Sequence, residues 1–333
     1  MHVLILGGSG SAGRALVRQL QGGGAPVDVC VVSRTATSLP GVARVLTGHY
    51  GDPACSDELR RWLADVDAVV HLADGLAVLQ EPRLAADTAE AERLISASQR
   101  LAAAVREAKV PLLVHVSSIK ALCDEEDGRL LTEACASRAT TLYGRSKLQL
   151  EQVMAQALAG SATRLAIVRN PAMYGPGKGG SVRRLLKLAD TALPLPLGGL
   201  SNRRSLLALD NFAGALAAIV RTPAEAAAGL FHVHDGPALS TTEIVATLRA
   251  ALGRPRRLLA VGAGGAGLAR RMPLIAPAAR RLYGSLEVSD AHFRQAFRWT
   301  PVIQTKAALA DMAAAWRTAP DLDAGSTAVP RAA

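Results

Sequence analysis

Tyr143 and Lys147 have the residue types and the spacing for acid–base chemistry on an alcohol or a ketone. They are four positions apart in the amphipathic segment Tyr143–Ala157, so both side chains are predicted on one face of a helix. An ammonium group near a tyrosine stabilises the tyrosinate, which lets the phenol exchange a proton at neutral pH. Ser117 and Ser118 end an upstream apolar segment, where a serine hydroxyl can hydrogen-bond the same reacting oxygen. Because such pairs also arise by chance, the other motifs decide how this one is interpreted.

Glycines at positions 7, 10 and 13 could bind a phosphate. They directly follow the apolar segment His2–Leu6 and open the helical pattern Ala12–Gln21. Glycine lets the backbone turn tightly and come close to a pyrophosphate, while the helix N-terminus supplies N–H groups and the positive end of its dipole. The strand–glycine–helix order therefore predicts a dinucleotide site. The alternative is a tight turn that needs glycine for its geometry alone.

The end of the second predicted strand bears on which dinucleotide is bound. A site that prefers NAD usually has Asp or Glu there to hold the ribose hydroxyls, whereas an arginine accommodates the 2′-phosphate of NADP. Here the strand ends in Val32-Ser33-Arg34, with no acid. The sequence therefore favours NADP(H), with NAD(H) as the alternative, unless Arg34 is simply an exposed loop residue.

These motifs need a scaffold, and the hydrophobic pattern predicts a Rossmann-like α/β domain. Short apolar segments alternate with longer amphipathic ones, which is typical of a doubly wound parallel sheet covered by helices on both faces. The predicted strands are His2–Leu6, Val27–Val32, Ala43–Leu46, Ala68–Leu72, Leu112–Val116 and Arg164–Arg169. The helical segments between them are Ala12–Gln21, Asp57–Leu63, Asp87–Glu107 and Tyr143–Ala157.

The pattern changes after Pro171, where glycine and proline cluster and the strands become shorter. We expect residues 1–171 to form the dinucleotide-binding domain that carries the catalytic residues. Residues 172–318 are expected to form mainly a smaller mixed α/β lobe for the substrate, with some segments returning to the main domain. Its predicted strands are Ser205–Leu209 and Leu230–His234. Residues 319–333 are expected to be a flexible tail.

Composition excludes several classes of function. The 333 residues are 50% hydrophobic and 20% charged, which indicates a folded chain, and only 3% are aromatic, so a nucleic-acid binder that relies on base stacking is not expected. The formal net charge of +10 suits anionic partners such as nucleotides or a nearby membrane surface, although it is also compatible with a merely solvated basic surface. No apolar run reaches the roughly 18–20 residues of a membrane-spanning helix.

Cysteine and histidine usage indicates a reduced compartment and no metal. The four cysteines form no Cys-x-x-Cys motif and no metal-ligand spacing with histidine, so they are expected to be free thiols of a cytoplasmic protein. His232 and His234 fall on one face of a predicted strand without a third ligand nearby, so no metal site is predicted. His71 and His115 are interpreted as structural residues.

Taken together in chain order, the motifs resemble those of the extended short-chain dehydrogenase/reductases, specifically the NAD-dependent epimerase/dehydratase family. The resemblance spans roughly residues 1–316. It rests on the glycine loop, His71-Leu72-Ala73, Ser117-Ser118, Tyr143-x-x-x-Lys147 and Tyr174-Gly175-Pro176-Gly177. Other stretches are similar to a bacterial branch of that family, the UDP-N-acetylquinovosamine 4-dehydrogenases. These include Ser117-Ser118-Ile119-Lys120, Asn202-Arg203-Arg204-Ser205-Leu206 and Arg281-Leu282-Tyr283-Gly284.

The resemblance implies roles for individual residues. Tyr143 would give a proton to the C4 oxygen of a sugar, Lys147 would bind the nicotinamide ribose, and Ser118 rather than Ser117 would polarise the carbonyl. The implied cofactor-binding residues are Gly7, Ser9, Gly10, Ser11, Gly13, Arg34, Asp52, Leu72, Ala73, Tyr143, Lys147 and Pro171. The implied substrate-binding residues are Ser118, Asn170, Ser181, Arg204 and Arg281, with the two arginines clamping a diphosphate.

The expected activity is therefore reduction of the C4 keto group of a UDP-4-keto-6-deoxy-N-acetylhexosamine by NADP(H), for O-antigen or capsule synthesis. One alternative is a UDP-sugar 4-epimerase that keeps NAD tightly bound. Another is a non-catalytic protein that senses a dinucleotide. The family resemblance further implies a homodimer, whose helix bundle would use an apolar helix face. Its residues would be Leu94, Leu101 and Val105 with Leu148 and Val153 of the next helix.

Overall fold

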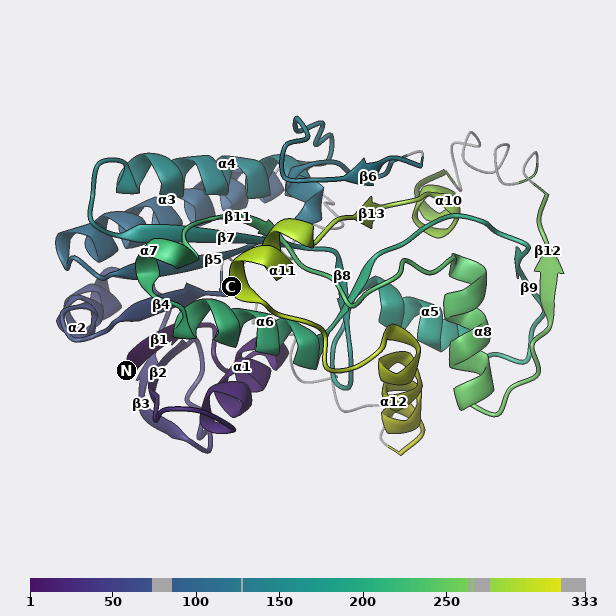
Figure 1. The fold of residues 1–333 in the computed structure, drawn as a ribbon, viewed down its shortest axis with the longest axis horizontal. Coiled ribbons are helices and arrows are strands. Elements are labelled where there is room, and N and C mark those ends of the chain that lie inside the picture. Colours follow the sequence, from purple (N-terminus) through teal and green to yellow (C-terminus); the bar gives the residue numbers. More distant parts are fainter. Residues whose placement is uncertain (74–85, 127, 263–264, 266–275, 319–333) are drawn as a thin grey trace.

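The computed structural model describes residues 1–73, 86–126, 128–262, 265 and 276–318. Its centre is a seven-stranded sheet in which every neighbouring pair is parallel (Figure 1). The predicted Rossmann-like fold is thereby confirmed. In spatial order the strands are β11 (Gly229–His232), β7 (Arg164–Asn170), β5 (Leu112–Ser118), β4 (Ala68–His71), β1 (His2–Leu6), β2 (Asp28–Ser33) and β3 (Val42–Thr47).

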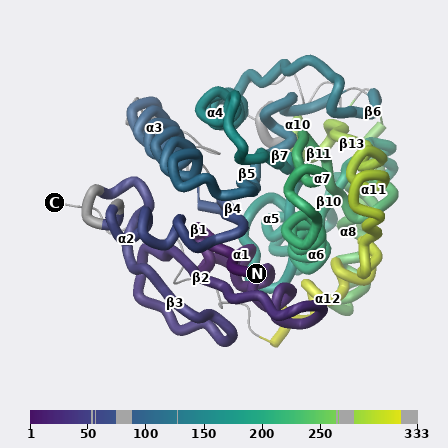
Figure 2. The backbone as a smooth tube through the Cα atoms, turned by 60° about the vertical axis from the view of Figure 1, so that its left-hand side comes forward, coloured from purple at the N-terminus to yellow at the C-terminus, as the bar shows by residue number. Residues whose placement is uncertain are grey.

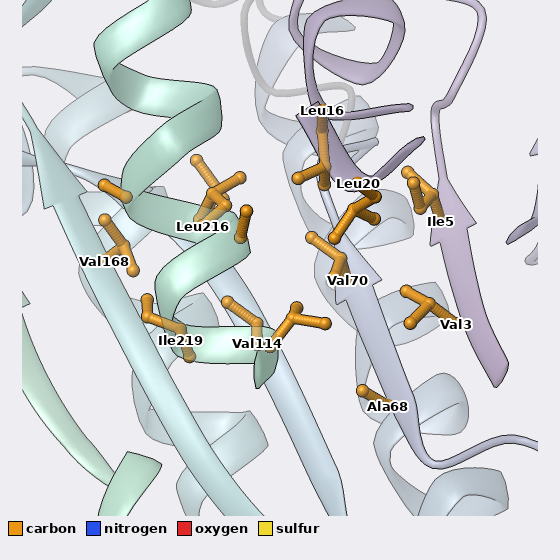
Figure 3. Close-up of a cluster of buried hydrophobic side chains, with 14 of the residues drawn as sticks. Val3, Ile5, Leu16, Leu20, Ala68, Val70, Val114, Val168, Leu216 and Ile219 are labelled. Atoms are coloured by element: carbon orange, nitrogen blue, oxygen red, sulfur yellow. The ribbon is translucent and has the colours of Figure 1, made fainter. Parts of the chain in front are cut away.

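Helices cover both faces of this sheet because successive strand residues point to opposite sides. In β1, Val3 and Ile5 belong to one buried cluster, whereas Leu4 and Leu6 belong to another. The first cluster lies under α1 (Ser11–Gln21) and α6 (Leu209–Arg221), as the side chains in Figure 3 show. The second lies under α2 (Pro53–Leu63), α3 (Ala86–Glu107) and α4 (Leu142–Leu158), and Figure 2 shows the resulting layers.

The apolar face of α3 is already covered within this chain. Leu94, Leu101 and Val105 are at most 2% exposed and pack in the second cluster against the sheet and α4. Half-buried Val153 of α4 packs on the same cluster. The expectation that these side chains form a dimer bundle is therefore wrong for the α3 residues, because the chain's own core takes up their surface.

A second lobe lies beyond the carboxyl ends of the strands, at the right of Figure 1. Its core is a cluster formed largely by three helices and two small parallel sheets. The helices are α5 (Ser181–Ala189), α8 (Thr241–Ala251) and α12 (Thr305–Thr318); the sheets pair β8 (Ala172–Tyr174) with β10 (Leu206–Ala208) and β9 (Leu195–Gly198) with β12 (Leu258–Ala260).

Part of the second half of the chain returns to the main domain. The segment Leu230–His234, which the pattern grouped with the smaller lobe, forms β11 at the edge of the main sheet and pairs with β7. Helix α6 packs against α1 on the same side, and short α7 (Ala224–Ala227) and α11 (Ala291–Phe297) lie near this edge. The expected tail, residues 319–333, lies outside the described residues.

Two connections fix the lobe against the main domain. The loop after β5 forms β6 (Leu130–Leu131), which pairs in parallel with β13 (Glu287–Val288) shortly after α10 (Ala276–Tyr283). Buried Asp235 accepts hydrogen bonds from the Tyr174 hydroxyl at 2.6 Å and from the Asn211 side-chain amide at 2.8 Å. Tyr174 of the Tyr-Gly-Pro-Gly motif is thus a structural residue that ties β8 to α6.

Membrane-spanning helices, metal-ligand groups and cysteine pairing can be assessed in the part of the chain that the structure describes. None of its helices combines the length and the apolar character that crossing a membrane requires. No group of three or more His, Cys, Asp or Glu side chains there is arranged to hold a metal ion. The four cysteines are free thiols.

Candidate active site

The glycine loop between β1 and α1 depends on glycine at two positions for its fold. Gly7 has φ of 90°, and a Cβ atom there would lie 2.8 Å from the Cβ of Ala73. A Cβ at Gly13 would lie 2.4 Å from the Cα of Gly8. The Leu72 N–H donates to the Leu6 carbonyl at 3.0 Å, which holds the end of β4 against this loop. The loop, Leu72 and Ala73 therefore form one compact unit.

Gly10 is different, because nothing in the fold requires it to be a glycine. A Cβ there would only meet the Gly7 carbonyl oxygen, at 3.5 Å, which is ordinary contact. Gly10 is exposed and is the N-cap of α1, with Ser11 as the first helical residue. A side chain at this position would cover the N–H groups of the first turn, which a helix leaves without internal partners. The site therefore fits a dinucleotide whose pyrophosphate lies against the start of α1.

Ser9 and Arg34 lie at the end of β2. The hydroxyl of Ser33, the last residue of β2, is 2.7 Å from that of Ser9, and the two hydroxyls are hydrogen-bonded. Arg34 follows in the exposed loop, so no carboxylate stands at the strand end. Burial is the main cause that lowers the pKa of His49; Arg34 lowers it further, whereas Asp52 at the N-cap of α2 raises it. The structure thus brings Arg34 and Asp52 around one site, next to the glycine loop.

The proposed catalytic residues meet at the carboxyl end of β5. Tyr143 lies in the first turn of α4, which the Thr141 side chain caps by accepting the Gly144 N–H at 3.1 Å. Lys147 follows one turn later and is 5% exposed; its Nζ donates to the Val116 carbonyl at 3.2 Å and lies 5.8 Å from the Tyr143 ring centroid.

Ser118 is the last residue of β5, and its hydroxyl oxygen accepts the backbone N–H of Lys120 at 3.3 Å. This bond uses a lone pair and leaves the Ser118 hydroxyl proton available for a ligand. Its neighbour Ser117 donates instead to buried Glu151. Of the two hydroxyls, that of Ser118 therefore keeps its proton for a ligand, whereas that of Ser117 is used within the protein.

Glu151 and Arg169 form a buried ion pair that the sequence analysis missed. Arg169 Nε donates to Glu151 Oε1 at 2.9 Å and Nη2 donates to Oε2 at 2.6 Å, and both side chains are 6% exposed. With the Ser117 bond, this network joins α4 to β5 and β7. A signal was present in the sequence, since Glu151 follows Lys147 by four residues and so shares its helix face.

Arginines gather on the lobe side of this site. The backbone of Arg204 forms isolated β-bridges with Leu239 on one side and Leu286 on the other. Its side-chain Nη1 donates a hydrogen bond to the Gly284 carbonyl at 2.9 Å. Burial lowers the pKa of Arg204, and Glu125 partly counteracts this effect. Arg281 on α10 and Arg204 both interact electrostatically with Lys120.

Lys120 and Arg184 also belong to this cluster, although the sequence analysis gave them no role. The pKa of Lys120 is lowered, chiefly because the ammonium is buried, and Asp124 opposes that effect. The positive charges that lower it further are those of Arg281, Arg204 and Arg184. Four cations from η2 (Ile119–Ala121), α5, α10 and the strand region near β10 therefore interact electrostatically with one another through Lys120, and such a cluster suits an anionic ligand such as a nucleoside diphosphate.

Asn170 and Ser181 lie at the rim of this arrangement. Asn170 ends β7 next to Ser118 in register; its Nδ2 donates to the Pro171 carbonyl at 3.0 Å, and its buried Oδ1 has no partner among the described residues. Pro171 is buried directly after the strand. Ser181 begins α5, three residues before Arg184, so the two share one helix face.

Comparison with known proteins agrees with this geometry. Residues 3–233 match the NAD dependent epimerase/dehydratase family. The chain belongs to this family. The family resemblance drawn from the motifs is thus confirmed, and the match ends at the residue that follows β11 in the main sheet.

Individual proteins match this chain over nearly its whole length. The UDP-glucose 4-epimerase of Vibrio cholerae is 26% identical over 306 residues, 90% of each protein. The structure of a UDP-N-acetylglucosamine 4-epimerase from Bacillus cereus superposes with a TM-score of 0.74 at 19% identity, covering 95% of this chain and 99% of that one. MoeE5, solved with UDP-glucuronic acid and NAD, gives 0.72 at 22% identity, covering 96% and 99%.

Proposed function

We propose that this family member transfers hydride at C4 of a UDP-sugar, and that its net reaction is reduction of the 4-keto group of a UDP-4-keto-6-deoxy-N-acetylhexosamine by NADPH. The observation that carries the proposal is the position of Tyr143, because Nζ of Lys147 lies 5.8 Å and Nζ of Lys120, a member of the cation cluster, lies 6.0 Å from its ring centroid. The proton donor therefore adjoins the cation cluster, and the glycine loop follows β1, two strands away from β5 in the same sheet. The names of the relatives support a UDP-sugar as the substrate class.

The side chains of the protein account for the proton transfer in this reaction. The bound nicotinamide supplies the hydride, and the glycine loop, Ser11 and Arg34 would hold the dinucleotide. Tyr143 gives its proton to the C4 oxygen, and the Lys147 ammonium stabilises the tyrosinate that remains. Lys147 is held for this task by the Val116 carbonyl. Ser118 donates its free proton to the same C4 oxygen and increases the polarity of the carbonyl.

The cation cluster accounts for binding of the nucleotide. Arg204 and Arg281 are placed to bind the diphosphate, because a planar guanidinium can pair with two phosphate oxygens at once. Arg184 and Ser181 add donors from the start of α5. Asn170, with its unused buried Oδ1, offers an acceptor to a ligand N–H or hydroxyl beside Ser118.

The end of β2 favours a reductase over an epimerase. A 4-epimerase returns hydride to the same sugar and must retain its coenzyme, whereas a reductase exchanges it at each turnover. The absence of a carboxylate at Ser33-Arg34 suits exchangeable NADPH. The 26% identity to a UDP-glucose 4-epimerase keeps 4-epimerisation with retained NAD as the second candidate.

The decisive experiment follows absorbance at 340 nm while NADPH or NADH is mixed with enzymatically prepared UDP-4-keto-6-deoxy-N-acetylglucosamine. We expect rapid oxidation of NADPH, slower oxidation of NADH, and one reduced sugar per coenzyme. Interconversion of UDP-N-acetylglucosamine and UDP-N-acetylgalactosamine by a protein that retains NAD would show the epimerase instead. Coenzyme binding with no turnover on either class of sugar would favour a sensor.

The coenzyme preference gives a separate prediction for Arg34. Replacing it by alanine should raise the KM for NADPH roughly tenfold, because a charge-assisted hydrogen bond contributes about 1.5–3 kcal/mol. The KM for NADH should change less than about twofold on the same argument. Arg18→Ala is the matched control, since Arg18 is also an exposed arginine, on α1, and pairs with Asp210. Equal losses with both coenzymes would contradict a contact to the 2′-phosphate.

A further inference from the structure

Lys120 brings a second ammonium group to the catalytic tyrosine. It is the middle residue of η2, which follows β5 directly and is capped by Ser118. Its Nζ lies 6.0 Å from the ring centroid of Tyr143, whereas Nζ of Lys147 lies 5.8 Å from the same centroid. The two ammonium groups come from different elements, η2 and α4. Tyr143 is therefore approached by two cations, of which the proposed mechanism has used only one.

The backbone holds Lys120 firmly at this place. A Cβ atom on Gly144 would lie 2.4 Å from the Lys120 carbonyl oxygen, so α4 and η2 pack so closely that only glycine fits between them. Lys120 also donates its backbone N–H to the Ser118 hydroxyl. Since Gly144 directly follows Tyr143, this contact sets the position of Lys120 relative to the tyrosine and to Ser118 together.

The carboxylate that interacts electrostatically with the Lys120 ammonium is already occupied by other donors. The nearby carboxylate of Asp124 already accepts four hydrogen bonds, from the backbone N–H and hydroxyl groups of Thr140 and Thr141. Within residues 1–73, 86–126, 128–262 and 276–318 the Lys120 ammonium makes no hydrogen bond, while Lys147 is bound to the Val116 carbonyl. A half-buried ammonium that contacts a ring but has no hydrogen-bond acceptor is unfavourable in the free protein, and it suits a ligand that accepts a hydrogen bond.

Lys120 differs in position from the arginines of the cluster. Arg204 is held at the Gly284 carbonyl and Arg281 lies on α10, both on the lobe, whereas Lys120 follows the catalytic strand and reaches the tyrosine ring. Among the cations of the cluster, Lys120 is therefore the one that belongs to the main domain and contacts the ring of the catalytic tyrosine. This geometry places Lys120 at the sugar end of the ligand rather than at the diphosphate.

We propose that Lys120 is a catalytic residue that contacts the sugar beside Tyr143 and stabilises the negative charge that develops there during hydride transfer. The inference rests on the proposed function. In the step, hydride would leave NADPH, which becomes NADP⁺, and would form a C–H bond at C4 of the sugar. The π bond of the carbonyl opens onto the C4 oxygen, and this oxygen takes its proton as the O–H bond of Tyr143 breaks. Lys120 keeps its proton throughout, and its ammonium group donates a hydrogen bond to the sugar while facing the tyrosinate.

The test compares Lys120→Met and Lys120→Arg with Lys306→Met, a control that removes an exposed lysine of α12. For Lys120→Met we expect kcat to fall about 10- to 100-fold, because one preorganised electrostatic donor is lost. Lys120→Arg should restore part of the loss. The Kd for NADPH and for UDP alone should stay within about twofold, since neither ligand contains the hexose that Lys120 would contact. The Kd for a UDP-hexose should rise severalfold.

Each other result has a definite meaning. A large rise in the Kd for UDP with an unchanged kcat would make Lys120 a diphosphate ligand and overturn the proposal, as would a variant that behaves like wild type. If the wild-type protein epimerises sugars instead of reducing them, the same kcat comparison applies to that reaction. If it turns over nothing, the proposed function fails, and the ratio of UDP-sugar to UDP affinity still decides whether Lys120 contacts the sugar.

Discussion

Replacing Tyr143 by phenylalanine is expected to lower kcat by about 10²–10⁴, the usual contribution of a positioned general acid. The phenyl ring can keep the packing of Tyr143, which is 7% exposed and belongs to the cluster between the sheet and α3 and α4. Only the proton donor is lost, so the loss should appear in kcat rather than in binding. The measurement is single-turnover oxidation of NADPH with the keto sugar, together with the Kd values for NADPH and UDP.

Tyr283→Phe provides the matched control for this change. Its hydroxyl donates to the Pro196 carbonyl at 3.2 Å in the second lobe, away from β5 and α4. We expect this variant to keep kcat within about twofold and to lose at most about 1 kcal/mol of stability. If Tyr143→Phe retained more than a tenth of the wild-type kcat, another group would have to protonate the C4 oxygen, and the assignment of Tyr143 would be wrong.

Replacing Glu151 by glutamine is expected to destabilise the fold by about 3–5 kcal/mol, because it leaves the buried guanidinium of Arg169 without its carboxylate. The change keeps the shape of the side chain, so lost packing contributes little. Ser117 can still donate to the amide oxygen of glutamine, so the lost charge on Arg169 dominates. The free energy of unfolding is measured by urea denaturation, with a check that the slope against denaturant is unchanged.

A control and a rescue separate this effect from a general loss of charge. Glu90→Gln removes the carboxylate of a partly exposed pair with Arg93, and it should cost less than about 1 kcal/mol. The double variant Glu151→Leu with Arg169→Met removes both buried charges and should recover part of the stability lost in Glu151→Gln. A Glu151→Gln protein within 1 kcal/mol of wild type would mean that water or a rearrangement satisfies Arg169.

The elements that local pattern determines could be predicted from the sequence. The first strand was expected at His2–Leu6 and has those bounds, because apolar residues and the following glycine mark both ends. The place of β11 could not be predicted, since a short strand pattern says nothing about its partner, and β7 lies about 60 residues earlier in the chain. Nor does an apolar face on α3 indicate whether a second copy or the chain's own sheet covers it.

The residues of the candidate site likewise include some that the sequence could predict and some that it could not. Tyr143 and Lys147 are recognisable because a helix places residues four apart on one face. Glu151 obeys the same rule, but its importance depends on Arg169, which reaches it only after β7 has paired with β5. Lys120 could not be recognised either, because its closeness to Tyr143 depends on how tightly η2 packs against α4 at Gly144.

The return of the chain to the sheet limits how the protein can be divided. A fragment that ended at Pro171 would lack β11, and the backbone N–H and C=O groups of β7 would form an open sheet edge, which is prone to pair with other chains. It would also lack α6, so Val114 and Val168 would face water. Exchange of substrate lobes between family members should therefore leave residues 209–233 with the N-terminal part, because two distant stretches of sequence make up one folding unit.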